Sequence, residues 1–380
     1  MQIAYRHYHD GDDDDLANLY NIAFQMNGAG FVRTPKGWNW RYVQSPSFEP
    51  EMIQIAEDKD TQKIVGAIHV NLIEELMLNE KKYLFGEIND VICHPDYTNN
   101  GIATKLLKRA IQYMERKGCD FSILTADAKG FPRKKLYLRN GFEDYSRLVM
   151  LFSFPNIFRL IRDFPGFSGF IPVFFILSYL PRIIFRFLIR RNPNFKDISY
   201  EIVYNSKHFE YIDARNKILP KYYDGSSEFD NKMIKWARMN LTAKRHHPTY
   251  IMMRKNSKII GGAVFTRKNI YSFKHGIKLR MAIIHEIFLD KNQFKDKLNL
   301  HYGYKYLIDR TLKAATKRNI SFILHSPSEN DKDVINSFKS MTFLKFPSAM
   351  IMIKSFKGNI KNLKIKKPFF MPTHVSLAFP

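Results

Sequence analysis

The feature of this sequence that most constrains its fold is an internal repeat. Three blocks of the first 150 residues return, in the same order, in the second half of the chain. KIVGA at 63–67 returns as KIIGG at 258–262, LLKRAIQYMERKGCDFSIL at 106–124 as LIDRTLKAATKRNISFIL at 307–324, and YLRNGFEDY at 137–145 as FKSMTFLKF at 338–346. The offsets are 195, 201 and 201 residues. Because order and spacing are both kept, we infer two copies of one domain.

The repeat divides the 380 residues into four segments. The predicted limits are a first copy at 1–150, a connecting segment at 151–197, a second copy at 198–357 and a C-terminal tail at 358–380. Each copy is long enough to bury a hydrophobic core of its own.

Hydrophobic periodicity predicts that strands alternate with helices in the first copy. The predicted strands are Ile3–Tyr8, Met52–Glu57, Lys63–Leu72, Tyr83–Cys93, Asp120–Thr125 and Phe142–Phe152, and the predicted helices are Asp12–Phe24, Ile102–Lys117 and Arg133–Asn140. This alternation indicates an α/β or α+β domain.

The positive charge of the chain is unevenly distributed. Sixty Lys and Arg against 36 Asp and Glu give a net charge of +24. Residues 1–150 carry 19 basic and 21 acidic side chains, whereas residues 151–380 carry 41 and 15. A uniform coat of nucleic acid is therefore not expected, because the excess belongs to the second part of the chain.

Cysteine content and hydropathy bear on the compartment. The two cysteines, Cys93 and Cys119, exclude a disulfide framework and a Cys-based zinc site, and we expect no metal. The N-terminus MQIAYRHYHDGDDDD lacks the apolar region of a secretory signal. The longest apolar stretch, 170–180, has 11 residues, whereas a membrane-crossing helix needs about 20. We expect a cytoplasmic protein that associates at most peripherally with a membrane.

The connecting segment 151–197 differs in composition from both copies. It contains eleven Phe and six Arg, and Asp163 is its one acid before Asp197. Two interpretations remain open. The segment is a helical linker that covers apolar surface, or it is an interfacial element whose Phe side chains enter an anionic lipid surface while its arginines pair with head groups.

The block GEINDVICHPDYTNNGIATKLL, at 86–107, carries the chemistry. A predicted strand leads into the short loop TNNGIA, which opens a helix. Gly101 permits close approach of the backbone, and the free N–H groups from Asn100 to Thr104 then point beyond the helix N-terminus. This geometry suits a pyrophosphate.

In its flanking residues this block resembles motif A of the GNAT (Gcn5-related N-acetyltransferase) superfamily. There, V-x-[VC]-x-P-x-[YF] leads into [RQ]-x-x-G-x-[GA], and here VICHPDY leads into TNNGIA. A second family block, [LF]-Y-x-x-x-G-F, is matched by LYLRNGF at 136–142. The resemblance is strong over 1–150, and weak but ordered over 198–357. It implies a tandem of two GNAT-like domains, each with a mixed, mostly antiparallel central sheet flanked by helices.

The resemblance also implies acetyl-CoA as the acyl donor. The residues that it assigns to cofactor binding, mainly through backbone amides, are Ile92, Cys93, Thr98, Asn99, Asn100, Gly101, Ile102, Ala103 and Thr104. One departure is that Thr98 stands where the family has Arg or Gln, so a long side chain is missing near the phosphates. Lys105 or Arg139 is a candidate to replace it. Cys93 is interpreted as a strand residue and not as a nucleophile, because no His partner lies at a useful spacing.

The family mechanism is direct attack of an amine on the thioester. Tyr137 matches the tyrosine that protonates the leaving thiolate, and Glu87 has the spacing of the base in the histone-acetylating branch. Strand alternation predicts that Glu87 shares a face with Asn89 and Cys93, with Asp90, the second candidate base, on the opposite face. A third candidate is the C-terminal carboxylate of Pro380, which the tandem members of the family suggest.

The second copy lacks these groups. The residue that matches Tyr137 is Phe338, and the segment DKNQFKDKLNLHYGYKYL contains no G-x-[GA] loop. We therefore expect the second copy to be structural, or to shape the acceptor pocket together with the first.

The leading hypothesis is an acetyl-CoA-dependent N-acyltransferase that acts on a primary amine in the first copy. The alternative is a non-catalytic binder of anionic surfaces or nucleic acid on a GNAT scaffold. A narrower version keeps the enzyme and places its acceptor at a membrane. The sequence leaves the acceptor, the length of the acyl chain and the oligomeric state open.

Overall fold

The protein is described from a computed structural model, which covers residues 2–25, 29–203, 208–230, 232, 236, 248–272, 277–358 and 367–370. The strands are β1 (Ile3–His7), β2 (Ala29–Gly30), β3 (Ile53–Asp58), β4 (Lys63–Leu78), β5 (Lys81–Cys93), β6 (Phe121–Asp127), β7 (Glu143–Ser153), β8 (Ile198–Val203), β9 (Thr249–Lys255), β10 (Lys258–Ser272), β11 (Ile277–Leu289), β12 (Phe322–His325) and β13 (Leu344–Ser355).

The α-helices are α1 (Asp13–Gln25), α2 (Pro35–Arg41), α3 (Ile102–Arg116), α4 (Ile157–Asp163), α5 (Ile171–Ser178), α6 (Leu180–Arg191), α7 (His208–Tyr222), α9 (Lys297–Lys317) and α10 (Lys332–Ser340). Shorter helical turns are η1 (Pro50–Met52), η2 (Pro95–Tyr97), η3 (Arg133–Tyr137), η4 (Leu138–Asn140), η5 (Pro165–Phe170), η6 (Pro193–Phe195) and η8 (Lys291–Gln293). The predicted elements of the first copy are all present, and β4 continues six residues beyond the predicted end at Leu72.

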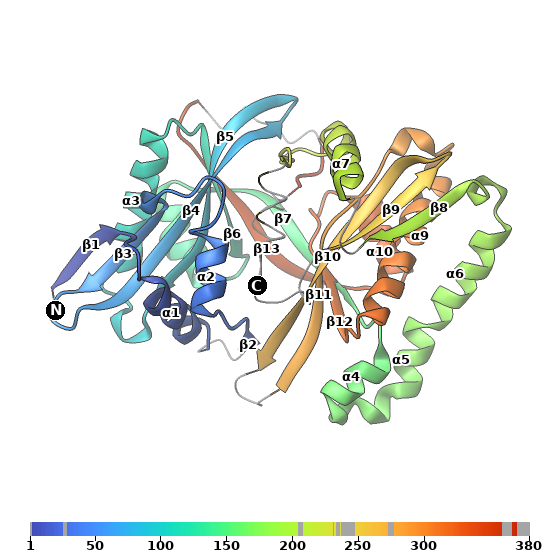
Figure 1. The fold of residues 1–380 in the computed structure, drawn as a ribbon, viewed down its shortest axis with the longest axis horizontal. Coiled ribbons are helices and arrows are strands. Elements are labelled where there is room, and N and C mark those ends of the chain that lie inside the picture. Colours follow the sequence, from blue (N-terminus) through green and yellow to red (C-terminus); the bar gives the residue numbers. More distant parts are fainter. Residues whose placement is uncertain are drawn as a thin grey trace.

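The described strands form one continuous sheet that runs through both halves of the molecule (Figure 1). Its order is β1-β3-β4-β5-β6-β13-β7-β12-β11-β10-β9-β8, and β2 pairs with β10. Neighbours are antiparallel except in the pairs β5–β6 and β11–β12, which are parallel. The predicted α+β class, with mixed, mostly antiparallel sheets flanked by helices, is confirmed.

The two copies exchange their last strands. Strand β13, which belongs to the second copy in sequence, lies between β6 and β7, with Met352 opposite Leu124. Strand β7 of the first copy in turn pairs with β12, with Ser153 opposite Ile323. Each half of the sheet is therefore completed by a strand from the other half.

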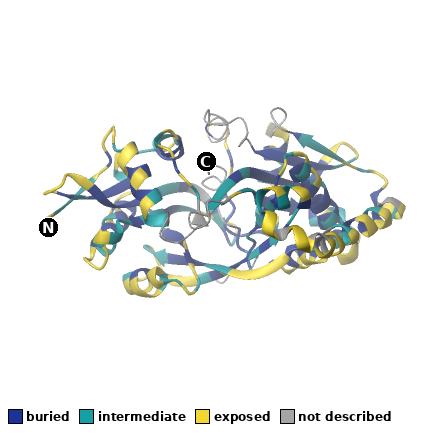
Figure 2. Cartoon of the chain, turned by 90° about the horizontal axis from the view of Figure 1, so that it is seen from below, coloured by how far each residue is buried: buried dark blue, intermediate teal, exposed yellow. Residues whose placement is uncertain are grey.

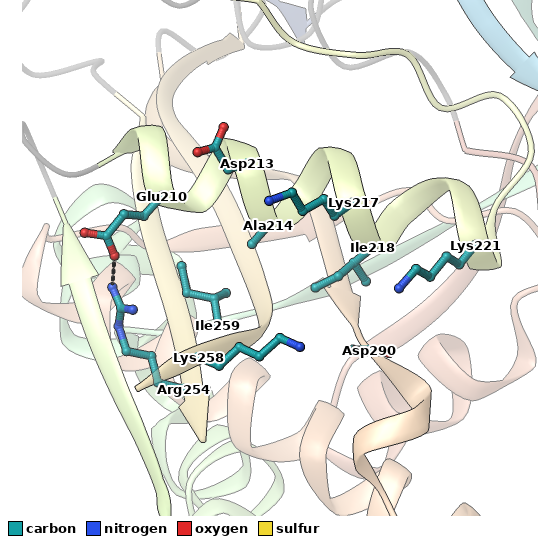
Figure 3. A pocket seen from close by; sticks show the side chains of 10 residues that line it. All are labelled: Glu210, Asp213, Ala214, Lys217, Ile218, Lys221, Arg254, Lys258, Ile259 and Asp290. Carbon is teal, nitrogen blue, oxygen red and sulfur yellow. Dashed lines mark hydrogen bonds and ion pairs between the residues drawn. The ribbon is translucent and has the colours of Figure 1, made fainter. Parts of the chain in front are cut away.

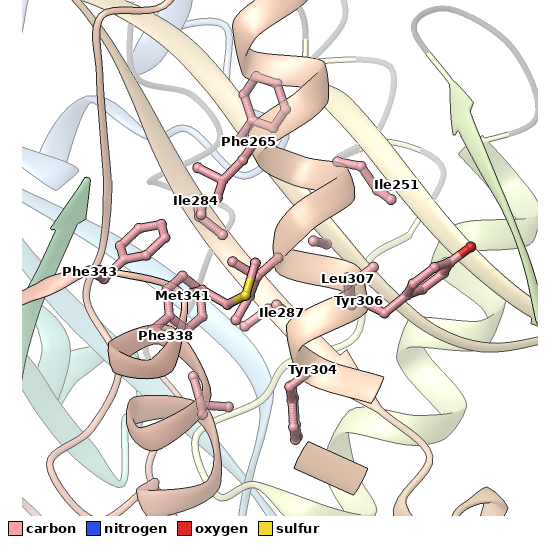
Figure 4. Packing of buried hydrophobic residues seen from close by; sticks show 14 of the residues in the cluster. Ile251, Phe265, Ile284, Ile287, Tyr304, Tyr306, Leu307, Phe338, Met341 and Phe343 are labelled. Carbon is pink, nitrogen blue, oxygen red and sulfur yellow. The ribbon is translucent and has the colours of Figure 1, made fainter. Parts of the chain in front are cut away.

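The hydrophobic cores show the same exchange. Helix α3 packs Leu106, Ala110 and Met114 against β4 and β5, and Met352 of β13 belongs to this core. The second-copy core gathers side chains of β10, β11, α9 and α10, including Phe338 and others drawn in Figure 4, and also takes in Leu151 of β7. The apolar side chains of α3, spaced at 3.6 residues, therefore pack into a core to which both copies contribute side chains.

The connecting segment forms three helices, α4, α5 and α6, along the outer edge of the second half (Figure 1). On α6 the side chains of Phe185 and Ile189 are buried in the second-copy core. None of the helices in the described part of the chain is long and apolar enough to cross a membrane.

Candidate functional site

The candidate site begins where two parallel strands separate. Strands β5 and β6 pair from Phe85–Phe121 to Ile88–Leu124. Beyond this point no pair between them is found in the described chain, although β5 continues to Cys93 and β6 to Asp127. The carboxyl end of β5 therefore diverges from β6. The main-chain N–H and C=O groups on this side of β5 could form hydrogen bonds with a ligand that lies between the two strands.

The loop after β5 leaves the start of α3 open. Gly101 is the N-cap residue, with φ +74°, and it makes no side-chain cap. Asn99 also has a positive φ, +67°, and turns the chain into the helix. The first-turn N–H groups of Ile102, Ala103 and Thr104 therefore face outward at the positive end of a 15-residue helix. Such an end can bind a phosphate or pyrophosphate.

The side chains of this loop bond to the loop itself. Thr98 Oγ1 donates to the carbonyl of Pro95 at 2.9 Å, and Asn100 Nδ2 donates to the carbonyl of Tyr97 at 3.3 Å. Lys105 Nζ lies 4.3 Å from the centroid of the Tyr5 ring. The backbone amides therefore remain the groups of this loop that could bind a phosphate.

Ile92 and Cys93, the two strand residues predicted to lie beside the pantetheine arm of the cofactor, are both fixed by contacts within the protein. Ile92 is 2% exposed, and its side chain packs in the hydrophobic cluster that includes side chains of α1 and α2. Cys93 Sγ lies 3.6 Å from the carbonyl oxygen of Tyr97, and burial raises the pKa of its thiol. The thiol is therefore held in its less nucleophilic, protonated form, which agrees with a structural role for Cys93.

A β-bulge in β5 corrects the predicted face assignment. Between β4 and β5 the register shifts from Ala67–Ile92 to His69–Asn89, so β5 carries one extra residue here, and Asp90 has φ +43°. The bulge breaks the alternation of side chains. Val91 and Cys93 pack with Ile88 on the α3 side, whereas Glu87 and Asp90 both act electrostatically on Arg41. The prediction that Glu87 shares a face with Cys93 and that Asp90 is opposite is therefore wrong.

Glu87 is buried and titrates near neutral pH. Its side chain is 4% exposed, and burial raises its pKa from 4.5 to about 7. The polar side chains of Asn89 and Asn71 and the charge of Arg41 oppose part of this shift. A carboxylate with such a pKa can accept a proton from an amine and release it near pH 7.

Asp90, in contrast, is engaged by a cation. Arg33 Nη2 lies 2.9 Å from Asp90 Oδ2, and the same guanidinium donates from Nη1 to the hydroxyl of Tyr42 at 2.8 Å. The Arg33 side chain also lies over the ring of Tyr20, with 4.0 Å from Cζ to the ring centroid. Because its oxygen is committed to Arg33, Asp90 is a weaker candidate base than Glu87.

Three basic side chains are buried in this region, and sequence reasoning did not assign any of them. Arg33 and Arg41 are each 2% exposed, and Lys268, from β10 of the second copy, is fully buried. Burial and the nearby Arg33 charge lower the pKa of Arg41 to about 10. Burial, followed by the charges of Arg41 and Arg33, lowers the pKa of Lys268 well below its usual range. The second copy therefore places a buried amine, whose charged form is disfavoured, near Arg33 and Arg41 of the first copy.

His69 also belongs to this centre. It is 1% exposed and lies against the Tyr42 ring, with 3.8 Å between centroids. Both ring nitrogens are buried without a hydrogen-bond partner in the described part of the chain. Burial, together with the Arg41 and Arg33 charges, lowers the pKa of His69 well below 6.5, so the ring is neutral. Of this missed group, Arg41 alone had a signal in sequence, as part of the segment GWNWRY that precedes β3.

Tyr137 lies at the end of the π-helical turn η3 and is 7% exposed. Its ring packs edge-on against Phe142, with 6.0 Å between centroids, and belongs to the α3 core. Burial raises the pKa of its hydroxyl to about 12. The hydroxyl therefore keeps its proton across the physiological range, as a general acid requires.

In the second copy, the helix N-terminus that corresponds to the start of α3 is capped, and a phenylalanine replaces the tyrosine. Helix α9 is capped by Asp296, whose side chain accepts from the Asn299 N–H, where α3 has Gly101 and no cap. Phe338 is fully buried and stacks on His325 at 5.0 Å between centroids. An acidic cap at the helix N-terminus repels a phosphate, so the copy-two helix is not equipped as a pyrophosphate site.

A cavity of about 370 Å³ lies in the second copy, between α7 and strands β9 and β10 (Figure 3). Its lining carries both signs of charge, and Arg254 pairs with Glu210 at 2.5 Å across one end. The lining residues are Glu210, Asp213, Ala214, Lys217, Ile218, Lys221, Arg254, Lys258, Ile259 and Asp290. None of them is a predicted site residue.

The third candidate base, the carboxylate of Pro380, lies outside the described residues. The last described residues of the chain are buried between the halves. The Phe370 N–H donates to the Asp224 carbonyl at 2.6 Å, and the Phe369 ring packs edge-on against Tyr145 of β7 at 5.5 Å between centroids.

No group of three or more His, Cys, Asp or Glu side chains that could hold a metal ion is found among the described residues. Residues 15–142 match the model of the Acetyltransferase (GNAT) family. No curated protein matches the sequence.

The whole chain is similar to solved structures of N-myristoyltransferase from Saccharomyces cerevisiae. Two structures with bound myristoyl-CoA match with TM-scores of 0.69 and 0.67, at 14% and 15% identity, and cover 94% and 93% of this chain and 80% and 82% of those chains. A third, with myristoyl-CoA and inhibitors, matches with a TM-score of 0.66 at 15% identity, over 93% of this chain and 79% of that chain. At these identities the likeness shows a shared fold across both halves. Residues 15–142 are therefore similar to the GNAT family, and the chain as a whole shares the fold of these N-myristoyltransferase structures.

Proposed function

We propose that this protein is an acyl-CoA-dependent N-acyltransferase that moves an acetyl group to a primary amine, with its chemistry in the first copy. The observation that carries the proposal is the contrast between the two helix N-termini. Helix α3 begins at an uncapped Gly101 beside two diverging strands, whereas α9 is closed by Asp296. The family match over residues 15–142 covers the open copy.

In the proposed mechanism the amides of residues 99–104 hold the pyrophosphate of coenzyme A, and the main chain at Ile92 and Cys93 holds the pantetheine arm and the thioester carbonyl. The amine attacks this carbonyl, and Glu87 accepts the amine proton. The tetrahedral intermediate then collapses, the carbon–sulfur bond breaks, and Tyr137 gives its proton to the leaving thiolate. Products are an amide and free coenzyme A.

The buried cations support the proton balance of this mechanism. Arg33 pairs with Asp90, and the charge of Arg41 acts on both Asp90 and Glu87. Positive charge near the acceptor disfavours an ammonium ion relative to the neutral amine that must attack.

The first test is binding and turnover with purified full-length protein. We expect acetyl-CoA to bind in isothermal titration calorimetry and thiol release to follow when a panel of amines is added. Tyr137→Phe should lower kcat by about 10²-fold or more with little change in melting temperature, because one hydroxyl is removed from a packed ring. Absence of binding at millimolar acetyl-CoA, or unchanged turnover in Tyr137→Phe, would overturn the proposal.

The acyl chain is tested in the same assay with acetyl-, octanoyl- and myristoyl-CoA. The similar yeast N-myristoyltransferase structures have bound myristoyl-CoA. Preference for a long chain would remove the acetyl assignment and leave the acyltransferase.

The base is identified by three variants. Glu87→Gln should lose most of its activity, whereas Asp90→Asn should lose less. A chain without residues 371–380 tests the C-terminal carboxylate. Full activity of Glu87→Gln, with loss in one of the other two, would move the assignment to that group.

A further inference from the structure

The connecting segment presents an apolar surface to solvent. Of the 18 large apolar residues that are exposed in the described chain, ten lie between residues 158 and 188. They are Phe158, Phe170, Val173, Phe175, Ile176, Leu180, Ile183, Ile184, Phe187 and Leu188. We call the helices that carry them, α4, η5, α5 and α6 (157–191), the arm. In Figure 2 much of the arm is coloured as exposed.

Helix α6 shows that this exposure is not a failure to pack. Its inner face is fixed by Phe185 and Ile189, which are 2% and 5% exposed, and by Arg182, whose Nη2 donates to Ser153 Oγ at 2.9 Å. Its outer face, with Ile184 at 51% and Phe187 at 53%, is also apolar. A helix on the surface of a protein normally turns polar residues outward, so an apolar outer face needs a partner.

The charges beside this face select the kind of partner. Arg162, Arg191 and Lys196 are exposed on the arm or just after it, and Arg191 Cζ lies 3.9 Å from the centroid of the Phe187 ring. The acid within the arm, Asp163, is already paired with Arg159 and accepts from Ser321 Oγ at 3.1 Å. Exposed arginines therefore border exposed phenylalanines without an opposing acid on the arm.

We propose that the arm is an interfacial membrane anchor, which lays its Phe and Ile face into the outer acyl region of an anionic bilayer while its arginines pair with lipid phosphates. The helices of the arm have 7, 8 and 12 residues, too short to cross, but suited to lie in the plane of the surface. The arm forms a long outer edge of the molecule rather than a groove, and a flat bilayer fits such an edge (Figure 1). This inference does not depend on the proposed enzymatic activity.

The test is flotation of the full-length protein with vesicles of phosphatidylcholine alone and of phosphatidylcholine with about one third phosphatidylglycerol. We expect strong flotation with the anionic vesicles, and weaker flotation at about 0.5 M NaCl than at about 0.1 M because the phosphate contacts are screened. The variant Ile184→Ser/Phe187→Ser should bind at least about tenfold more weakly, since apolar burial supplies the anchoring.

A matched control is Phe131→Ser/Leu298→Ser, which removes two apolar residues that are 67% and 63% exposed outside the arm. This variant should float like the wild type. Melting curves of both variants report whether they fold, and Arg162→Gln/Arg191→Gln probes the charges without touching the apolar face.

Three results would overturn the proposal: no flotation of the wild type, equal loss in the control variant, or dimerisation in light scattering that Ile184→Ser/Phe187→Ser abolishes. The last would identify the arm as an interface between two copies of the chain. Coenzyme A binding by the same variants should not change, so failure of the anchor and failure of the proposed function are separately visible.

Discussion

At the scale of single residues, the raised pKa of Glu87 couples stability to pH in a direction that can be measured. The native pKa of about 7 lies above the ordinary 4.5, so the folded chain keeps a proton that the unfolded chain has lost. The free energy of unfolding should therefore fall as pH rises from about 4.5 to about 7, by roughly 3 kcal/mol. Glu87→Gln cannot ionise and should be more stable than the wild type at about pH 8, with no gain at about pH 4.

The same titration predicts that kcat/KM rises with pH through about 7, because the base must be deprotonated to accept a proton. Urea unfolding at both pH values and a pH–rate profile are the measurements. A Glu87→Gln protein that is less stable than the wild type at about pH 8 would show that the carboxylate is instead stabilised in its charged form.

Sequence reasoning at this scale reached the residues within a matched motif and missed those brought in by folding. Tyr137 and Gly101 could be named as candidates because the motif fixes their spacing, and their roles stay predictions. The relation of Glu87 to Asp90 was predicted wrongly, because a bulge has no signature in the alternation of side chains. Lys268 could not be assigned at all, since it stands 227 positions after Arg41 in the sequence and only folding brings the two side chains close together.

At the scale of elements, the N-terminus of α3 is the feature to test. Gly101 has φ +74° and no atom within 4 Å of an added Cβ, so Gly101→Ala introduces backbone strain but no clash. We expect the loop to shift and coenzyme A affinity to fall about tenfold, since the amides proposed to bind the phosphates move together. Calorimetric titration with coenzyme A measures the effect.

The matched control is Gly358→Ala, which has φ +87° and is equally open. Gly358 lies beside the other end of α3, because Lys357 Nζ donates to the carbonyl of Gly118 at 2.7 Å. Gly358→Ala should lower the free energy of unfolding by an amount similar to that for Gly101→Ala and leave the affinity for coenzyme A unchanged. Equal losses of affinity in both variants would mean that the open helix end does not hold the cofactor.

Elements themselves were largely predictable, since α3 and the strands β1 and β3 to β7 follow apolar spacing and turn residues closely. Their partners were not. The repeat indicated two copies, but nothing in a repeated sequence distinguishes a strand that returns to its own sheet from one that crosses to the other. The exchange of β7 and β13 is decided by tertiary packing, which local patterns do not record.

At the scale of the whole molecule, the exchange predicts that damage in the second copy reaches the site in the first. Met352 is fully buried in the core beneath α3, although its sequence belongs to the second copy. Met352→Ala should lower the free energy of unfolding by about 2–5 kcal/mol and should weaken coenzyme A binding, because the cavity opens under the helix that we propose holds the phosphates. Urea unfolding and calorimetric titration measure the two effects.

The control is Met253→Ala, which removes an equally buried methionine from β9, far along the sheet from β6. It should cost similar stability and leave coenzyme A affinity close to that of the wild type. If the copies unfold together, as a continuous sheet with exchanged strands requires, both variants should show one transition with coincident fluorescence and circular dichroism midpoints. Two separate transitions, with Met352→Ala shifting only the one that belongs to the second copy, would contradict a shared core.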